Sequence, residues 1–516
     1  MKFLLRCTSF FLLLLLLRPS LAFPDSKPMK LVGSLSPYTS PYDCCLFGAV
    51  VVDAQRGVAY MGAFNEEFNG SHGAAVIDIR DRAHPVLTMD LGPPPQTCTN
   101  GCQSHSFDVD LVGRYLVVSH SPTLGGAFAG CSVYDTRADP FHPTLVRRFN
   151  IGGCGFESSV LDPEVENGRP YAYGFSHCLF PVNSGGVYVM NILTGEIVSR
   201  FNSSEPNVCP PFPCHEDNNP HEGFVQRHPR SGRMLLYIGY WDSGLRIADV
   251  TDPRHPVEVG AFDYGPGTPY QNAHTATATP SGNWVYVNDE LGQGEPPGGG
   301  VHIFDTHTCD GTSYCSPTLA GFYHAAGAPV QDPNDLYSSF LAWDAHNMTP
   351  YGENTFALGN YGYGARLVDT SDKAHPRERS FFLPNSNAPL EWVGVIGSDG
   401  LFYTSDINRG LFILKSNGLD QQNAGSAALR VTPDESVSGT HEVSFVTTRE
   451  GRISLEIFDV VGRLVARTPT DYVAAGSHTL SWDGKANGRR AATGIYFAKV
   501  STPDGRVSGK LIHLAP

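Results

Sequence analysis

The chain has 516 residues, of which 41% are hydrophobic and 17% charged, and its formal net charge is -15. This length exceeds what one ordinary hydrophobic core covers, so we expect two or more domains, or one large repeat array with an added module. The acidic balance opposes binding to nucleic acid and to anionic lipid, so neither is expected as a partner.

The first residues have the pattern of a secretory signal. Two basic residues precede an apolar run over 10–17, and the small-residue sequence Ser20-Leu21-Ala22 follows it. We predict a signal peptide over 1–22, with cleavage before Phe23. No later stretch reaches the roughly 18 to 20 apolar residues that a membrane-spanning helix needs. We therefore expect no transmembrane span in the mature chain, and a location outside the cell or at the outer-membrane surface.

Cysteines of an exported chain are candidates for disulfides before they are candidates for metal ligands. Cys7 lies in the predicted signal, so eleven of the twelve cysteines remain and at least one thiol stays unpaired. The local pairs that best suit the bracing of loops are Cys98 with Cys102, Cys209 with Cys214, and Cys309 with Cys315. Neither of the first two pairs has a second pair at zinc-ribbon spacing, which argues against a structural zinc site.

The region after the signal is rich in turn residues and in short β-branched runs. With 55 glycines and 39 prolines in the chain, this pattern predicts many short strands and little helix. One unit recurs: strand, turn, strand, turn, a strand that ends in Asp, and a proline turn. It is clearest over 221–260, 274–305 and 346–376, and weaker copies cover 49–92, 104–151, 157–201 and 391–414.

Four-stranded units at a spacing of about 45 to 70 residues are typical of propeller blades with variable loops. We therefore predict an all-β chain in which residues 23–415 form a seven-bladed β-propeller. The seventh copy lacks an outer strand, and we expect residues 31–35 to supply it. Closing the ring in this way removes two free sheet edges, which otherwise invite aggregation.

One repeat carries a recognisable motif. Residues 244–256 contain Gly-Leu-Arg-Ile-Ala-Asp and, two residues later, Asp-Pro-Arg-His-Pro. This motif resembles the LVIVD repeat, and the similarity extends over roughly residues 30 to 415. The resemblance implies a propeller made of such repeats. Two copies depart from it, since Asn191 replaces the strand-end Asp in the third, and Ser416-Asn417 replaces the Asp-Pro turn in the seventh.

The C-terminal part has a different organisation. Residues 416–428 are rich in small and polar residues and are predicted to be a linker. Residues 429–516 contain strand patterns at 455–465, 475–484 and 494–497. Their order resembles the FlgD-type immunoglobulin-like module and the C-terminal sorting domains of type IX secretion. The resemblance implies a small β-sandwich that contacts the secretion machinery, and display or release at the cell surface.

The candidate site lies at the start of the first strand of each blade. These strands line the central channel of a propeller, so their first residues converge. Here those positions hold His105, Glu157, His221, Glu222, His274, His346 and Glu391. Imidazole and carboxylate together suit a divalent metal ion such as copper, manganese or zinc. The alternative is structural, with each histidine satisfying backbone groups of a neighbouring blade.

Two functions fit this sequence. One is a surface binding or scaffold module for a glycan, a peptide or a protein partner, and the sequence favours it because rigid repeats and a sorting module suffice. The other is a metal-dependent enzyme, an oxidase or a polysaccharide-lyase-like protein, that uses the channel histidines. No catalytic residue is assigned, since phosphate-binding loops, HExxH and GxSxG are absent. The enzyme requires at least three of the four histidines to face one cavity.

Overall fold

The structure is a computed structural model. It describes residues 26–38, 47–63, 72–93, 104–106, 108–122, 128–153, 155–176, 185–203, 219–264, 272–290, 299–327, 343–384, 389–416, 441–447, 451–468, 471–473, 476–486, 488–502 and 505–513. The predicted signal peptide, the predicted linker beyond Ser416, and the predicted pairs Cys98 with Cys102 and Cys209 with Cys214 lie outside these residues.

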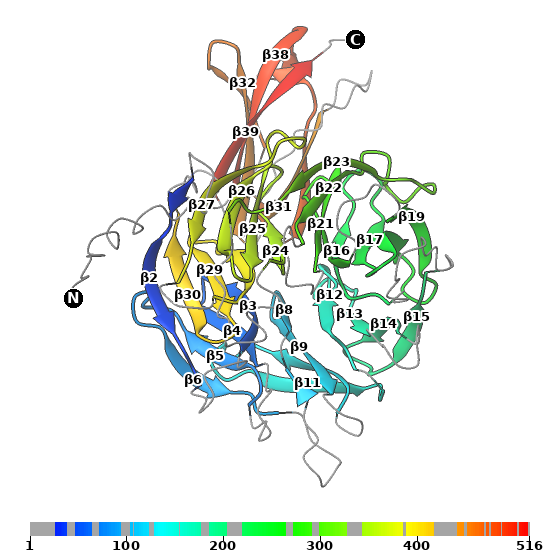
Figure 1. The fold of residues 1–516 in the computed structure, drawn as a ribbon. Helices are drawn as coiled ribbons and strands as arrows, with labels where there is room; N and C mark the ends of the chain where they lie inside the picture. Colours follow the sequence, from blue (N-terminus) through cyan, green and yellow to red (C-terminus); the bar gives the residue numbers. More distant parts are fainter. Residues whose placement is uncertain are drawn as a thin grey trace, which may run out of the picture.

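Seven sheets of four or five strands surround a central axis in Figure 1. Blade 1 comprises β3 (Phe47–Asp53), β4 (Val58–Ala63), β5 (Ala75–Asp78) and β6 (Val86–Asp90). Blade 2 comprises β7 (Ser104–His105), β8 (Val109–Val112), β9 (Tyr115–Pro122), β10 (Gly130–Asp135) and β11 (Thr144–Asn150). Blade 3 comprises β12 (Ser158–Leu161), β13 (Tyr171–Ser176), β14 (Gly186–Asn191) and β15 (Ile197–Phe201).

The remaining blades follow in chain order. Blade 4 comprises β16 (Glu222–Arg227), β17 (Met234–Gly239), β18 (Gly244–Asp249) and β19 (Val257–Asp263). Blade 5 comprises β20 (Ala273–Ala278), β21 (Trp284–Asp289), β22 (Val301–Asp305) and β23 (Thr318–Tyr323). Blade 6 comprises β24 (Met348–Pro350), β25 (Thr355–Asn360), β26 (Gly364–Asp369) and β27 (Arg377–Phe382), and blade 7 comprises β28 (Glu391–Ile396), β29 (Phe402–Asp406) and β30 (Gly410–Lys415).

The innermost strands close a ring. Each contacts the innermost strand of the next blade, and β28 of blade 7 contacts β3 of blade 1. No α-helix occurs in the described residues. These residues therefore contain no helix long and apolar enough to span a membrane. The predictions of an all-β chain and of a seven-bladed propeller are confirmed.

The N-terminal segment completes two blades. β2 (Lys30–Leu35) pairs antiparallel with β30 and is the outer strand of blade 7, as the sequence predicts. β1 (Lys27–Pro28) pairs parallel with β27 and extends blade 6, which the sequence did not predict. The buried Met29 between them packs against Leu367 and Leu414, so one short segment joins the two blades.

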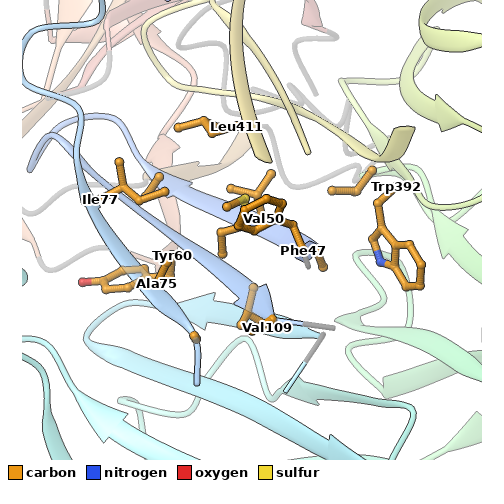
Figure 2. Packing of buried hydrophobic residues seen from close by; sticks show 14 of the residues in the cluster. Phe47, Val50, Tyr60, Ala75, Ile77, Val109, Trp392 and Leu411 are labelled. Atoms are coloured by element: carbon orange, nitrogen blue, oxygen red, sulfur yellow. The ribbon is translucent and has the colours of Figure 1, made fainter. Parts of the chain in front are cut away.

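The core lies between the blades because the middle strands are apolar on both faces. Every residue of β4 and of β17 is buried. Figure 2 shows one such cluster, in which Phe47, Tyr60 and Ile77 of blade 1 lie with Leu411 of blade 7 and Val109 of blade 2. Burying an apolar side chain of this size contributes about 1.5 to 3 kcal/mol. This packing between sheets fixes the position of each blade relative to its neighbours.

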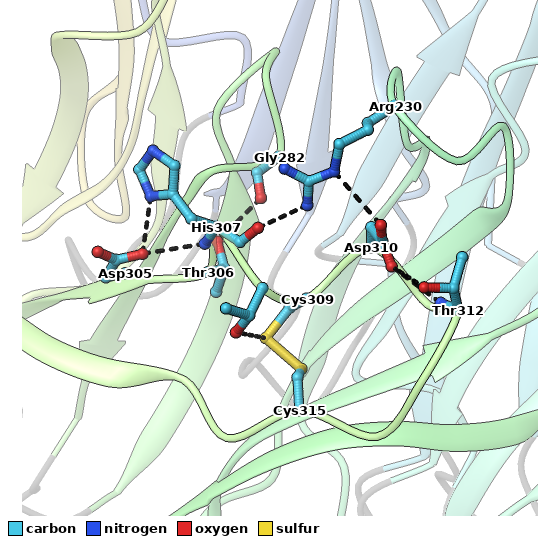
Figure 3. Close-up of a disulfide and its surroundings, with 10 residues drawn as sticks. Arg230, Gly282, Asp305, Thr306, His307, Cys309, Asp310, Thr312 and Cys315 are labelled. Atoms are coloured by element: carbon cyan, nitrogen blue, oxygen red, sulfur yellow. Dashed lines mark hydrogen bonds and ion pairs between the residues drawn. A yellow bond between two sulfur atoms is a disulfide. The ribbon is translucent and has the colours of Figure 1, made fainter.

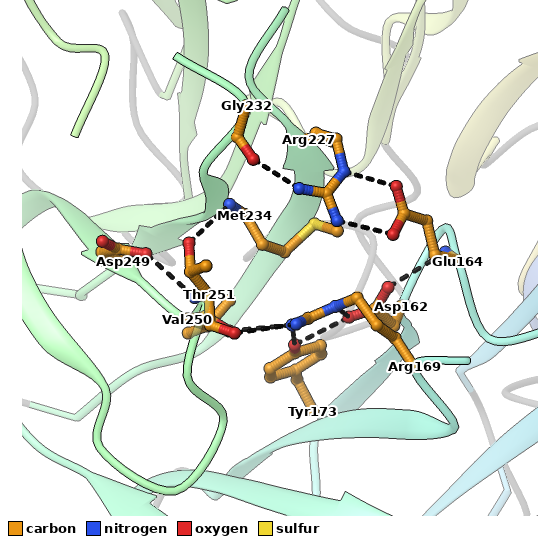
Figure 4. A network of polar contacts seen from close by, with 10 residues as sticks. All are labelled: Asp162, Glu164, Arg169, Tyr173, Arg227, Gly232, Met234, Asp249, Val250 and Thr251. Carbon is orange, nitrogen blue, oxygen red and sulfur yellow. Dashed lines mark hydrogen bonds and ion pairs between the residues drawn. The ribbon is translucent and has the colours of Figure 1, made fainter. Parts of the chain in front are cut away.

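Polar contacts also join neighbouring blades. In Figure 4, Glu164 accepts from the Arg227 guanidinium of blade 4, with Nη2 2.6 Å from Oε2. Arg169, which precedes β13, donates to the Val250 carbonyl of blade 4 at 2.8 Å and to Asp162 at 3.0 Å. These contacts span blades 3 and 4 at the end of the strands opposite the candidate site.

The proline turns and the predicted pair of Cys309 with Cys315 both stabilise the connections between strands. In the proline turn of blade 4, His255 Nδ1 lies 2.8 Å from Asp252 Oδ2, and blades 1, 2 and 6 repeat this contact. Cys309 and Cys315 form a disulfide that closes the turn before β23, and Figure 3 shows the neighbouring Asp310 bound by Arg230. Cys131 is a free and buried cysteine.

The C-terminal module is a small immunoglobulin-like β-sandwich. One sheet has the order β33 (Leu464–Arg467), β32 (Gly451–Asp459), β38 (Gly494–Thr502) and β39 (Gly505–His513), and β34 (Asp471–Val473) pairs with β32. The other pairs β31 (His441–Thr447) with β35 (Gly476–Trp482), and β36 (Lys485–Ala486) pairs with β37 (Arg489–Arg490). Its own core contains Val443, Leu455, Trp482, Ala498 and Leu511.

Candidate metal centre

Three consecutive blades contribute equivalent residues to one cluster. Blades 4, 5 and 6 each place a histidine at the start of the innermost strand, namely His221, His274 and His346. The next residues are Glu222, Thr275 and Asn347. Because the first and second strands are antiparallel, the corner after the second strand lies beside these positions. The corner residues are Trp241, Glu290 and Tyr361.

The histidine rings lie close because the blades approach closely here. The ring centroids of His221 and His274 are 4.1 Å apart, and those of His274 and His346 are 4.4 Å apart. A Cβ atom on Gly239 of β17 would lie 2.5 Å from the His274 carbonyl oxygen. Gly359 of β25 has the same relation to blade 7, since its Cβ would lie 2.4 Å from the Val393 nitrogen. Glycine at these points permits the neighbouring innermost strand to come near.

Within the cluster, His274, Glu290 and His346 form a triad whose donor atoms lie within 4.8 Å of one another. His274 Nε2 is 3.3 Å from Glu290 Oε2. Both histidines are 1% exposed, and the side chain of Glu290 is 15% exposed. An ion bound at about 2.0 to 2.2 Å from each donor would draw these side chains closer together.

Each member of the triad has its other polar atom engaged. His346 Nδ1 lies 2.9 Å from the Trp392 carbonyl oxygen, and a carbonyl can only accept, so Nδ1 carries the hydrogen and Nε2 the lone pair. The Tyr361 hydroxyl donates to Glu290 Oε1 at 2.7 Å, which leaves Oε2 toward His274. His274 Nδ1 lies 2.9 Å from the Thr275 hydroxyl. Such outer contacts orient metal ligands and fix the tautomer of ligating histidines.

Burial keeps His346 in the protonation state that a metal ion needs. Desolvation lowers the pKa of His346 to about 3, so its imidazole is neutral at physiological pH. Neutral imidazole is the form that binds metal ions. The site requires no further deprotonation of this residue before an ion enters.

His221 and Glu222 lie at the edge of the triad. With His274 they form a second group whose donor atoms are within 4.8 Å of one another. Burial and the nearby Asp108 carboxyl raise the pKa of Glu222 well above its usual value. The two Glu222 carboxyl oxygens lie 2.6 Å from the Thr275 hydroxyl and 3.3 Å from Asn347 Nδ2.

The indole of Trp241 forms one wall of the cluster. It stacks on His221 with the ring centroids 4.7 Å apart. Among the described residues other than glycine, Trp241 alone has a positive φ, of 35°. Two backbone hydrogen bonds to Ala273 of blade 5, at 3.1 and 2.9 Å, hold this conformation. Such strain costs of order 1 to 3 kcal/mol and is concentrated at functional sites.

The structure brings together four of the seven residues that the sequence proposed: His221, Glu222, His274 and His346. Neither group of potential ligands in the described residues includes the other three. Glu391 lies inside blade 7, where it accepts from the Thr404 hydroxyl at 2.6 Å and burial raises its pKa. Glu157 accepts from the Ser121 hydroxyl at 3.4 Å. His105 stands on β7, where the innermost strand of blade 2 is divided into two short strands.

Sequence reasoning missed Glu290 and Tyr361, although a signal was available. Both follow the second strand of a blade, and the repeat alignment gives Trp241, Glu290 and Tyr361 the same position. In an antiparallel pair the end of the second strand adjoins the start of the first. Comparison of that corner between blades would have placed a carboxylate beside His274.

Two family models match parts of the chain: the LVIVD repeat at residues 235–264 and the FlgD Ig-like domain at residues 431–505. No curated protein matches the sequence.

Several solved structures are similar at low sequence identity. The C-terminal WD40 domain of Sif2 is 10% identical, with 76% of this chain and 99% of that chain covered and a TM-score of 0.46. PorZ, a surface component of the type-IX secretion system of Porphyromonas gingivalis, is 12% identical, with 89% and 64% covered and a TM-score of 0.37. The Cps50 (Swd1) β-propeller domain of Myceliophteria thermophila is 11% identical, with 71% and 96% covered and a TM-score of 0.42. At these values none of the three bears on function.

Proposed function

We propose that this chain, an LVIVD-repeat β-propeller with a C-terminal FlgD Ig-like domain, is exported and binds a divalent transition-metal ion at His274, Glu290 and His346. One observation carries the proposal: each of the three residues has its second polar atom held by another group and its remaining donor atom in the common cluster. A structural role for the histidines does not require this convergence. The predicted signal and the FlgD Ig-like domain support a location at the cell surface.

The donor set indicates the class of ion. Two imidazole nitrogens and one carboxylate oxygen suit zinc, iron, manganese or copper, and three protein ligands leave coordination positions for a further ligand. A bound ion of this kind would supply Lewis-acid chemistry at the cluster. His221 and Trp241 lie beside His274, where they would face whatever ligand completes the coordination.

The binding-module hypothesis becomes a part of this proposal. A glycan, peptide or protein partner at the surface, and the secretion machinery at the C-terminal module, remain the proposed partners. The convergence of His274 and His346 with Glu290 adds a metal ion that such a partner could contact.

The test is metal analysis of the purified mature protein beside a Glu290→Gln variant. After incubation with zinc, manganese, copper or iron and removal of free ion, plasma mass spectrometry should find a nearly stoichiometric metal in the wild type. Glu290→Gln removes the carboxylate ligand and should lower metal affinity by at least about 10- to 100-fold. Glu157→Gln is the control, since it changes a carboxylate at the start of a first strand, outside the triad. A wild type that takes up none of the four metals would contradict the proposal.

A further inference from the structure

The groups beneath the triad form a hydrogen-bonded ring across three blades. The Thr275 hydroxyl oxygen lies 2.6 Å from Glu222 Oε2, 2.8 Å from Asn347 Oδ1 and 2.9 Å from His274 Nδ1. Asn347 Nδ2 lies 3.3 Å from Glu222 Oε1 and completes the ring. The exposed fractions of Glu222, Thr275 and Asn347 are 5, 8 and 6%. At such burial, an unmade hydrogen bond costs about 1 to 3 kcal/mol.

The number of hydrogens in this ring determines the charge of Glu222. A threonine hydroxyl has one hydrogen to donate and can accept two. Asn347 Oδ1 can only accept, so the hydroxyl hydrogen goes to it. The Thr275 oxygen must then accept from its two other neighbours, which are Glu222 Oε2 and His274 Nδ1. A hydrogen on each satisfies every contact, whereas an ionised Glu222 leaves the ring one hydrogen short.

The same result holds with the Asn347 amide turned over. Its oxygen would then face Glu222 Oε1 at 3.3 Å, and two acceptors meet there unless Glu222 carries a hydrogen. Both orientations therefore place a hydrogen on the Glu222 carboxyl.

We infer that Glu222 is a neutral, proton-bearing positioning residue that acts through Thr275 to hold His274 in the tautomer whose Nε2 faces the metal site, and that it is not a metal ligand. A protonated Glu222 leaves the Thr275 oxygen as an acceptor for His274 Nδ1–H. The lone pair of His274 is then on Nε2, the atom 3.3 Å from Glu290. The part that concerns the ion rests on the proposed function, and the hydrogen on Glu222 does not.

The first test compares Glu222→Gln, Thr275→Val and Glu290→Gln in the full mature chain, with cobalt(II) as the probe ion. Glutamine reproduces a protonated carboxyl, since its amide donates to Thr275 and its carbonyl accepts from Asn347. Glu222→Gln should therefore keep cobalt affinity within about 3-fold and leave the cobalt absorption spectrum unchanged. Thr275→Val keeps the shape but removes the hydroxyl, and should lower affinity by about 10- to 100-fold with an altered spectrum. Loss of cobalt in Glu222→Gln, as in Glu290→Gln, would overturn the inference, and so would unchanged affinity in Thr275→Val.

A second measurement needs no ion. The infrared difference spectrum of wild type minus Glu222→Gln at neutral pH should contain the C=O stretching band of a protonated carboxyl. Carboxylate bands in its place would overturn the inference even if the wild type binds metal. If the wild type binds no metal and the protonated band is present, the proposed function fails while the assignment of the Glu222 proton stands.

Discussion

Glu222 of blade 4 and Glu391 of blade 7 both stand at the first position of an innermost strand, and both are buried. Glu222 bonds Thr275 of blade 5 and Asn347 of blade 6, so it connects three blades next to the triad of His274, Glu290 and His346. Glu391 bonds Thr404 within its own blade and lies near Asp406. Position in the repeat brings a residue to the channel, whereas the residues of the next blade determine whether it joins a site.

The same contrast appears at the third strand of the repeat. Arg366 of blade 6 and Arg246 of blade 4 are equivalent, and they are 0 and 2% exposed. Arg366 Nε lies 3.0 Å from the fully buried Glu378, which also accepts from Ser26 of the N-terminal segment. Arg246 pairs instead with Asp263, whose side chain is 56% exposed. One ion pair is sealed by the N-terminal segment, and the other is open to water.

Replacing these arginines should have the largest effect. Arg366→Met leaves the buried Glu378 carboxylate without its cation, and the free energy of unfolding should fall by about 3 to 5 kcal/mol. Arg246→Met leaves a carboxylate that water can solvate, so its loss should be clearly smaller. Urea denaturation of both variants measures the difference. Equal losses would show that the N-terminal segment does not seal the pair in blade 6.

Gly239→Ala tests the close approach that builds the site, with a somewhat smaller expected effect. The added Cβ would lie 2.5 Å from the His274 carbonyl oxygen, so β20 must move. We expect a loss of about 1 to 3 kcal/mol in unfolding free energy and weaker metal binding. Gly352→Ala is the control, because Gly352 has a φ of 65° but open space around it. It should cost about 1 kcal/mol and leave metal affinity unchanged, and a matching loss of affinity there would contradict the steric explanation.

The smallest effect concerns the pH dependence of stability. The contribution of a buried carboxyl and that of an exposed carboxyl should change in opposite directions as the pH rises. Burial raises the pKa of Asp108 from 3.8 to about 6, so between these values the folded state holds a proton that the unfolded state releases. Stability from this group therefore falls as the pH rises from about 4 to about 6. The exposed Asp252 has its pKa lowered by His255, and its contribution is lost as the pH falls through the folded value.

Thermal unfolding measured from about pH 2 to pH 7 covers both groups. Asp108→Asn should flatten the decline in stability toward higher pH, whereas Asp252→Asn should remove a small decline toward lower pH. A shift of the same sign in the two variants would contradict the contrast between the channel and the turns.

Much of the architecture follows from local sequence signals. Short alternating strands, strand-end aspartates and proline turns repeat along 23–415, and residues 31–35 have the pattern of the strand that closes blade 7. These signals depend on contacts within one blade, so they predict the propeller. The pairing of β1 with blade 6 had no such signal, because two residues carry no strand period.

By itself, the sequence determined the repeat, the C-terminal module and the fact that histidines recur at the first strand of several blades. Only the tertiary structure decided that His274 and His346 meet Glu290, that Glu222 contacts Thr275, and that the Glu391 side chain bonds Thr404 of its own blade. The physical reason is that the approach of His346 to Glu290 and the contact of Glu222 with Thr275 cross from one blade to the next. Such contacts depend on how closely neighbouring sheets pack, and glycines such as Gly239 set that distance.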